Sequence, residues 1–224
     1  MHEISSPYPL GIHEKWEVRN ALKRIFDLGV SSVALVFCLP FLVLLFFLVK
    51  RISKGPAFYS SQRIGKKGKL FTCWKLRSMY CDADQRLEAE LASNTKLKEE
   101  WQTYFKLKQD PRLTPIGRFL RSTSLDELPQ LWNVFIGDLS LVGPRPYLPR
   151  EMDTVCKILG KDVEKLFSVK PGLTGPWQTS GRNFLTFEQR VRMEVLYSSQ
   201  ASFFFDLYQI VKTLPILLFR KGAF

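Results

Sequence analysis

Two adjacent carboxylates, Asp126 and Glu127, are the side chains best suited to chemistry in this sequence. They lie in the stretch SLDELPQLWN, where Ser124 and Glu127 have the spacing of a helix capping box. If Ser124 caps the helix, Pro129 falls at the fifth helical position, where proline is costly. If Asp126 is the cap, Pro129 falls in the tolerated first turn. In both interpretations two acidic groups stand at a helix start in a basic chain, where an anionic ligand could bind through a bridging cation.

A single arginine between two prolines is the second candidate. Arg145 lies in the sequence VGPRP, and the residue before each proline is biased towards extended backbone. The segment therefore predicts a stiff turn that presents one guanidinium, whose fork matches a phosphate group. A plain surface turn is the alternative interpretation.

A glycine-rich stretch, KPGLTGPWQTSGR, is the third candidate. Gly172, Gly175 and Gly181 would allow close backbone approach, and Lys170 and Arg182 would supply positive charge. The alternative is a surface loop with a half-buried Trp177.

Composition excludes several other chemistries. The chain has 224 residues, only two histidines, and four cysteines without metal-ligand spacing. Histidine-based zinc sites and Ser-His-Asp or Cys-His catalysis are therefore disfavoured, and free thiols are expected. The formal net charge is +12, with 18 phenylalanines. This combination favours a membrane surface or a phosphorylated ligand as partner.

An uncharged run at 33–49 indicates a membrane helix. Pro40 lies inside this run and predicts a break or kink. Basic residues flank both ends, whereas a spanning helix shows positive charge mainly on its cytoplasmic side. We therefore expect a re-entrant helix over 23–50, broken at Pro40, with Lys23 and Arg24 available to a lipid phosphate or headgroup. A single spanning helix is the alternative.

The rest of the chain is expected to be mainly α-helical with a small β-hairpin. The hairpin is expected within 55–80, and one or two charged amphipathic helices within 82–109. A helical region at 187–219, broken near Pro215, ends in an apolar run typical of an interfacial or core helix. The predicted organisation is an N-terminal segment at 1–22, the re-entrant helix at 23–50 and a cytoplasmic catalytic domain at 51–224, with 82–109 as an insert.

Several segments together resemble the monotopic phosphoglycosyl transferases of bacteria, and within them the undecaprenyl-phosphate galactose phosphotransferases. The resemblance runs from about residue 20 to the end. It is carried by KRIFDLGVS, FYSSQRIGKKGKLFTCWKLRSM, LRSTSLDELPQLWNVFIGDLSLVGPRP, VKPGLTGPWQTSGR and RKGAF. Where the family has Ser-Pro at its helix break, this chain has Leu39-Pro40, which leaves open how the freed backbone carbonyl is satisfied.

The resemblance implies a monotopic protein on the cytoplasmic face of the bacterial inner membrane. The implied reaction moves a hexose-1-phosphate from a UDP-hexose to undecaprenyl phosphate and releases UMP. It would be the first membrane step of O-antigen, capsule or exopolysaccharide synthesis. Asp126 would form a covalent phosphosugar intermediate, and Glu127 would hold Mg²⁺. The implied substrate-binding residues are Arg145, Arg118, Arg121, Lys170, Gln178 and Arg182.

The sequence leaves three points open. Galactose, glucose and N-acetylated sugars all fit the motifs, a homo-oligomer is neither indicated nor excluded, and the insert at 82–109 has no assigned role. The rival from another class is a bitopic or peripheral basic protein that binds anionic lipid or nucleic acid without catalysis. That rival leaves the acidic pair and the proline-bracketed Arg145 unexplained. We therefore expect an enzyme that does not bind nucleic acid.

Overall fold

The computed structural model describes residues 16–104, 107, 109–180 and 185–219. These residues form mostly helices, with one antiparallel hairpin and one short parallel strand pair. The expected mainly helical fold with a small β-hairpin is confirmed, whereas the parallel pair was not expected. The helices and strands are α1 (Trp16–Ile52), β1 (Phe58–Ile64), β2 (Leu70–Leu76), α2 (Ala83–Ser93), α3 (Thr95–Tyr104), α4 (Pro115–Ser122), α5 (Gln130–Ile136), β3 (Ser140–Val142), α6 (Met152–Leu159), α7 (Val163–Leu166), β4 (Gly172–Thr174), α8 (Pro176–Thr179), α9 (Phe187–Gln200) and α10 (Phe203–Phe219).

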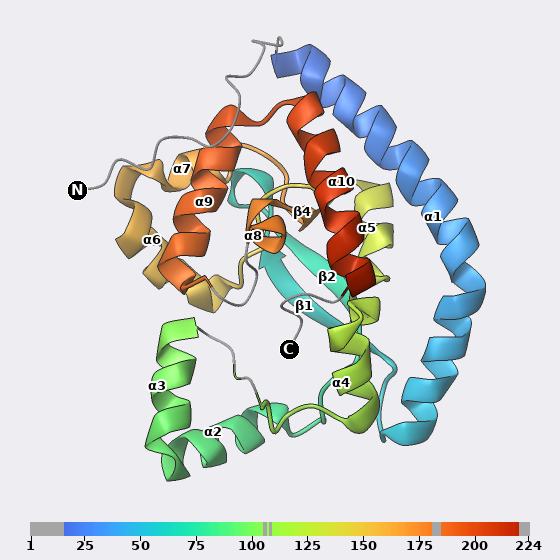
Figure 1. Ribbon diagram of the computed structural model, residues 1–224, viewed down its shortest axis with the longest axis vertical. Helices are drawn as coiled ribbons and strands as arrows, with labels where there is room; N and C mark the ends of the chain where they lie inside the picture. Colours follow the sequence, from blue (N-terminus) through green and yellow to red (C-terminus); the bar gives the residue numbers. More distant parts are fainter. Residues whose placement is uncertain (1–15, 105–106, 108, 181–184, 220–224) are drawn as a thin grey trace.

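The long helix α1 follows a curved path along one side of the molecule (Figure 1). Its 37 residues correspond to about 55 Å at the rise of an α-helix. It is long and apolar enough to cross a membrane, and 11% of its apolar window is buried. The inner side of the curve packs against α5, α4, β3 and α10. Helix α1 is therefore both the candidate membrane element and a part of the fold.

Helix α1 stays helical across Pro40, so the predicted break at this residue is wrong. Proline removes one backbone hydrogen bond, and a long helix can absorb that loss by curving. The hydroxyls of Ser31 and Ser32 both donate to the carbonyl of Leu28, so they do not satisfy the carbonyl of Val36 that Pro40 frees. The described helix also extends beyond both ends of the predicted 23–50.

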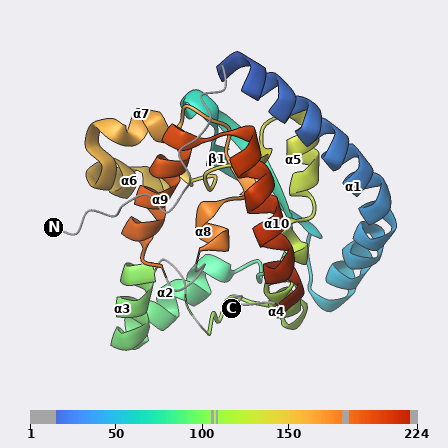
Figure 2. The same cartoon turned by 45° about the horizontal axis from the view of Figure 1, so that its top comes forward.

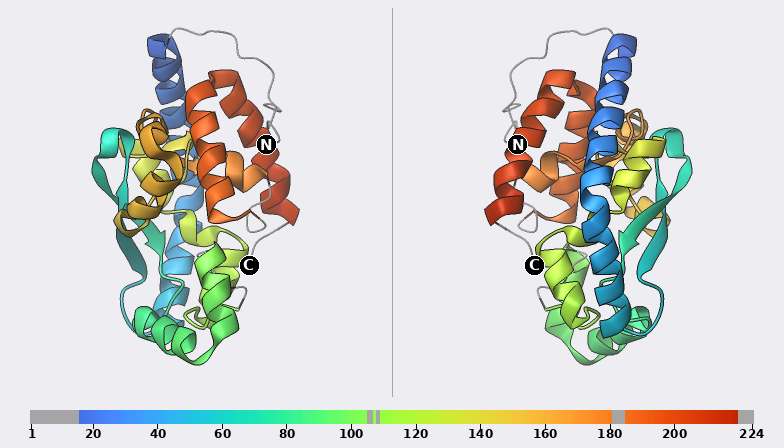
Figure 3. Two further views of the ribbon diagram at one scale, coloured as in Figure 1. Left: turned by 90° about the vertical axis from the view of Figure 1, so that its left-hand side faces the viewer. Right: turned by 90° about the vertical axis from the view of Figure 1, so that its right-hand side faces the viewer.

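The hairpin of β1 and β2 lies where the sequence predicts it. Its register places Tyr59 opposite Lys75 and Ile64 opposite Leu70. The connecting turn has Lys67 and Gly68 at φ 58° and 75°, a conformation that glycine tolerates and other residues rarely adopt. Seen from the side, the hairpin forms one flank of the molecule and α9 and α10 the other (Figure 3).

A pair of very close backbone contacts joins β3 to β4. A Cβ added at Gly172 would lie 2.0 Å from the nitrogen of Gly143, and one added at Gly175 would lie 2.2 Å from its carbonyl oxygen. The expected close approach at Gly172 and Gly175 is therefore confirmed, although the group approached is the protein's own chain. Gly181 lies outside the described residues.

The C-terminal helical region divides into α9 and α10 at Ala201 and Ser202, and α10 continues through Pro215. The predicted break near Pro215 is therefore wrong. Ser202 begins the new helix, because its hydroxyl accepts the backbone N–H of Phe205 at 3.1 Å. Between α9 and α10 lies the short helix α8 (Figure 2).

The segment 82–109 contains two helices, α2 and α3, as one of the two expected alternatives. Neither helix has a fully buried residue, which agrees with a solvated charged surface. Most of the buried apolar residues in the described ranges form three clusters. These are Phe71, Cys73, Val134, Leu139, Leu141, Val142, Val169 and Tyr197; Tyr147, Val155, Leu166, Phe187, Val191 and Val195; and Leu45, Val49, Ala57, Leu76 and Leu120.

Candidate active site

The acidic pair lies on a single 3₁₀ turn, Leu125–Glu127, between α4 and α5. Ser124 precedes this turn in the left-handed conformation, with φ 59°, and its side chain caps nothing. Helix α5 begins only after Pro129. Both predicted side-chain caps, at Ser124 and at Asp126, are therefore wrong. The left-handed conformation of Ser124 separates the end of α4 from the 3₁₀ turn. Pro129, which lacks an N–H, fits best just before the first hydrogen-bonded turn of α5.

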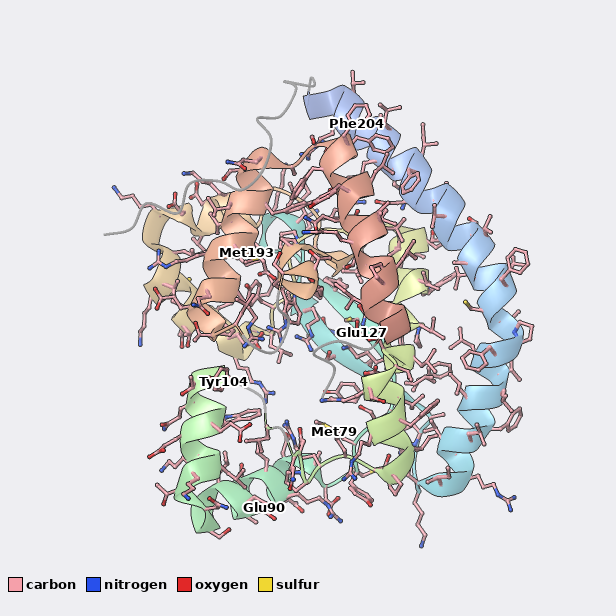
Figure 4. The ribbon with its side chains drawn as sticks, viewed as in Figure 1. Met79, Glu90, Tyr104, Glu127, Met193 and Phe204 are labelled. Carbon is pink, nitrogen blue, oxygen red and sulfur yellow. The ribbon has the colours of Figure 1, made fainter. Side chains whose placement is uncertain are left out.

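The two carboxylates have different surroundings. Asp126 is 5% exposed, whereas the side chain of Glu127 is 36% exposed and its Oε1 lies 2.6 Å from the Nζ of Lys75. Figure 4 shows Glu127 where α4, α5 and the hairpin meet. A buried carboxylate beside a more accessible one is an arrangement in which two acids can take different roles.

Burial raises the pKa of Asp126 to about 6. Lys75 and Arg121 oppose this effect by attraction, and the neighbouring Glu127 adds to it by repulsion. At neutral pH the carboxyl is therefore mostly ionised, yet held in surroundings that solvate it poorly. Strongly shifted carboxyls of this kind are typical of functional sites.

Lys75 is a site residue that the sequence analysis did not identify. It lies on β2, and α5 is fixed to that strand by Asn133. The side chain of Asn133 accepts the backbone N–H of Trp74 at 3.1 Å and donates to the carbonyl of Thr72 at 2.7 Å. This contact holds Lys75 against the acidic pair. No local signal in the sequence could have found it, because the partners are 52 residues apart.

Arg145 lies in a different cluster. Its guanidinium forms a bidentate pair with Glu151, at 3.1 Å for each contact, and its backbone N–H donates to Glu194 at 3.0 Å. The alternative interpretation, a plain surface turn, is therefore wrong. The expectation that Arg145 binds substrate phosphate stays a prediction, and in this arrangement the fork of Arg145 is engaged by Glu151.

The position of Arg145 along the hairpin separates it from the acidic pair. Its neighbour Tyr147 forms a bridge to Ile64, whereas Lys75 lies opposite Tyr59. The five residue steps from Tyr59 to Ile64 correspond to about 17 Å along a strand. The groups that act on the pKa of Asp126 are Lys75, Glu127 and Arg121, without Arg145.

A buried glutamate, Glu194, accepts the backbone N–H of Arg145. Glu194 accepts the hydroxyl of Tyr147, and burial raises the pKa of Glu194 to about 7. The guanidinium of Arg190, on the same helix, lies 5.5 Å from the ring centroid of Trp177. These groups are nonlocal in sequence, and they give the cluster a protonatable carboxyl within a largely buried network.

Of the remaining predicted site residues, Arg121 lies near the acidic pair and three others share a separate cavity. Arg121 is exposed on α4, donates to Ser78 at 3.0 Å and acts on Asp126, and Arg118 is exposed on the same helix. Gln178 lies on α8, and Arg182 lies outside the described residues. Lys23, Arg24 and Lys170 line one cavity together.

The donor set at the turn fits a magnesium ion. Asp126 and Glu127 are adjacent oxygen donors, and within the described ranges no cluster of three or more His, Cys, Asp or Glu forms a metal site. Mg²⁺ is commonly held by one or two carboxylates together with substrate phosphates, and keeps several waters. A closed protein cage is therefore not required, and of the two acids Glu127 is the more accessible to an ion.

The sequence also matches known proteins. A family model described as bacterial sugar transferase matches residues 18–220. An undecaprenyl-phosphate galactose phosphotransferase from Salmonella typhimurium is 44% identical over 203 residues, which are 91% of this chain and 42% of that protein. The exopolysaccharide production protein ExoY of Rhizobium meliloti is 40% identical over 204 residues, 90% of this chain and 88% of that protein. The chain thus spans about two-fifths of the length of the Salmonella relative and most of the length of the Rhizobium one.

Proposed function

The chain belongs to the bacterial sugar transferase family, and from that premise we propose that it transfers a hexose-1-phosphate from a UDP-hexose to undecaprenyl phosphate. Two relatives, each 44% identical to this chain, are named for galactose, and a third, 34% identical, is named for glucose. We therefore propose galactose-1-phosphate as the group transferred. The observation that carries the proposal is the buried Asp126 beside Glu127, with Lys75 and Arg121 acting on it.

We propose two displacements at Asp126. In the first, a carboxylate oxygen attacks the phosphorus that bears the sugar, and the bond to the bridging oxygen breaks so that UMP leaves with the electron pair. In the second, a phosphate oxygen of the lipid attacks the same phosphorus and releases the Asp126 carboxylate. One site can then serve a soluble donor and a lipid acceptor in turn.

Attack by a carboxylate on a diphosphate brings negative charge towards negative charge. Lys75 and Arg121 act on the carboxyl of Asp126 and would reduce this repulsion. Glu127 would hold Mg²⁺, which supplies charge neutralisation on the phosphate oxygens when it is bound. The raised pKa of Asp126, about 6, still leaves the carboxylate available at neutral pH.

We further propose that α1 holds this site at the cytoplasmic face of the bacterial inner membrane, as a re-entrant curved helix. Two observations support this. The apolar window of α1 is 11% buried, and both of its flanks are basic. The apolar residues Phe204, Tyr208 and Val211 of α10 are also exposed, as an interfacial helix requires. In this position the enzyme would carry out the first membrane step of O-antigen, capsule or exopolysaccharide synthesis.

A labelling experiment tests the covalent step. The full chain in detergent is given a UDP-hexose carrying radiolabel in the sugar, with Mg²⁺ and without lipid acceptor. Wild-type protein should acquire label, release one UMP per site, and lose the label when undecaprenyl phosphate is added. Asp126→Asn should acquire none, while Glu88→Gln, on the exposed surface of α2, should behave as wild type. UMP release that occurs only with acceptor present, without labelled protein, would refute the two-step scheme.

UDP-galactose, UDP-glucose and N-acetylated UDP-sugars, compared by UMP formation, then identify the sugar.

A further inference from the structure

A cavity at the N-terminal part of α1 is lined mainly by positively charged side chains. Its volume is about 70 Å³, several times the room that one water molecule needs. Five cationic side chains and one carboxylate line it, together with Asn20, Val169 and Tyr197. The charged groups are Arg19, Lys23, Arg24, Lys66, Lys170 and Asp27.

Three of these cations are fixed by contacts with the rest of the fold. Lys23 pairs with Asp206 at 2.5 Å, Arg19 donates to the carbonyl of Ala201 at 2.6 Å, and Arg24 donates to carbonyls at the end of α5 at 2.8 and 2.7 Å. They are therefore already in place, so a ligand would not have to order them.

The other two cations are lysines without an ion-pair partner. Among the residues that the structure describes, no carboxylate lies within 4.0 Å of the Nζ of Lys66 or Lys170. Asp27 and Asp138 attract Lys170 from a greater distance, and Asp27 already accepts the backbone N–H of Leu141 at 3.0 Å. Burial lowers the pKa of Lys170, and repulsion by Arg24 and Lys66 lowers it further. Like charges held together in this way favour the entry of an anion.

The cavity is separate from the acidic pair. Lys66 lies in the hairpin turn, whereas Lys75, which contacts Glu127, lies near the other end of β2. The five residue steps from Leu70 to Lys75 correspond to about 17 Å of strand, which is too far for one phosphate group to contact both sites.

We propose that this cavity binds a phosphate group, with Lys66 and Lys170 as its direct ligands and Arg19, Lys23 and Arg24 as its fixed positive field. The phosphate has two sources, which share one chemistry. It belongs either to the headgroup of an anionic phospholipid, since α1 is the candidate membrane helix, or to a soluble phosphate compound. Hydrogen bonds from ammonium groups to phosphate oxygens are the expected contacts.

Lysine acylation measures occupancy of the cavity without using turnover, so its outcome does not depend on the proposed function. The full chain in detergent is acylated with trace acetic anhydride, and the rate at each lysine is read by mass spectrometry. One arm adds inorganic phosphate, matched in ionic strength with chloride. The other compares vesicles of phosphatidylglycerol with vesicles of phosphatidylcholine. Lys161, which is exposed in the turn between α6 and α7 and does not line the cavity, is the internal reference.

We expect acylation of Lys66 and Lys170 to slow at least about fivefold while Lys161 is unchanged. Protection by inorganic phosphate identifies a soluble ligand, and protection in phosphatidylglycerol but not phosphatidylcholine identifies a headgroup. Lys170→Gln should weaken the protection of Lys66 about tenfold in phosphate or lipid concentration, whereas Lys161→Gln should not. Equal rates in all arms, or protection that includes Lys161 to the same degree, would overturn the proposal.

Discussion

Replacing Asp126 by asparagine should stabilise the fold while it removes the proposed reaction. Asparagine has the same shape as aspartate but carries no charge, so it avoids the cost of ionising a group that is 5% exposed. The folded pKa of Asp126 is about 6, raised from 3.8. The folded pKa lies above the unfolded value. The stability that protonated Asp126 contributes is therefore fully present below about pH 4 and is lost as pH rises through 6.

The size of the effect follows from the two pKa values. Because protonation is linked to folding, the ionisation of Asp126 lowers the free energy of unfolding by about 1 kcal/mol at pH 4.5 and by about 3 kcal/mol at pH 8. For a chain of this length these costs correspond to a higher melting temperature for Asp126→Asn by roughly 2–4 °C at pH 4.5 and roughly 6–12 °C at pH 8. Thermal unfolding of the full chain in one detergent, followed by circular dichroism at both pH values, measures the difference.

The matched control is Glu88→Gln, a neutralised acid on the exposed surface of α2. Its melting temperature should differ from wild type by the same small amount at both pH values. An Asp126→Asn protein that is no more stable than wild type at pH 8, or a stabilisation that does not grow between pH 4.5 and pH 8, would show that Asp126 is not held as a costly buried carboxylate.

Three further outcomes are expected. The kcat/KM for UDP-hexose should rise tenfold per pH unit below about pH 6 and level off as Asp126 ionises. In Lys75→Gln this rise should move to higher pH, because Lys75 lowers the pKa of Asp126. An unchanged pH profile would show that Lys75 does not act on the site. Gly117→Ala should lower the melting temperature by several degrees or prevent folding, because the added Cβ would lie 1.7 Å from a backbone carbonyl oxygen. Gly29→Ala, at a position of α1 where no atom lies within 4 Å of the added Cβ, should be neutral or stabilising. Similar melting temperatures for the two variants would contradict this. The melting temperature of Arg145→Lys should be lower than that of wild type by roughly 2–4 °C or more, since lysine cannot form the bidentate pair with the buried Glu151. A wild-type melting temperature would show that this pair is dispensable for stability.

The elements that could be predicted are those whose signal is local. The apolar run at 33–49 is sufficient to predict the core of α1, and alternating aromatic and polar residues around a glycine-containing turn are sufficient for β1 and β2. Pro40 and Pro215 predict helix breaks that the structure does not contain. A single proline costs one hydrogen bond, and long apolar helices such as α1 and α10 continue through it.

The site could be predicted only in part, because its contacts join distant segments. The residue types are sufficient to predict the acidic pair. The 3₁₀ turn that carries the pair depends on a left-handed Ser124. Serine rarely adopts this conformation, so its presence in the sequence does not predict the turn. The ion pair of Lys75 with Glu127 and the pair of Arg145 with Glu151 depend on which side chains the folded backbone brings together. Electrostatic complementarity between remote residues leaves no periodicity in the sequence.

The contacts of α1 have a practical consequence for anyone who wants a water-soluble version of this protein. Asp27 receives a backbone N–H from β3, Arg24 closes the end of α5, and Leu45 and Val49 complete one of the apolar clusters. Deleting residues up to 52 would therefore expose that cluster and unpair these groups, and the remainder should aggregate rather than dissolve. Solubility has to be sought by substituting the outward-facing side chains of the helix, such as Phe37 and Phe47, while its inner side is kept.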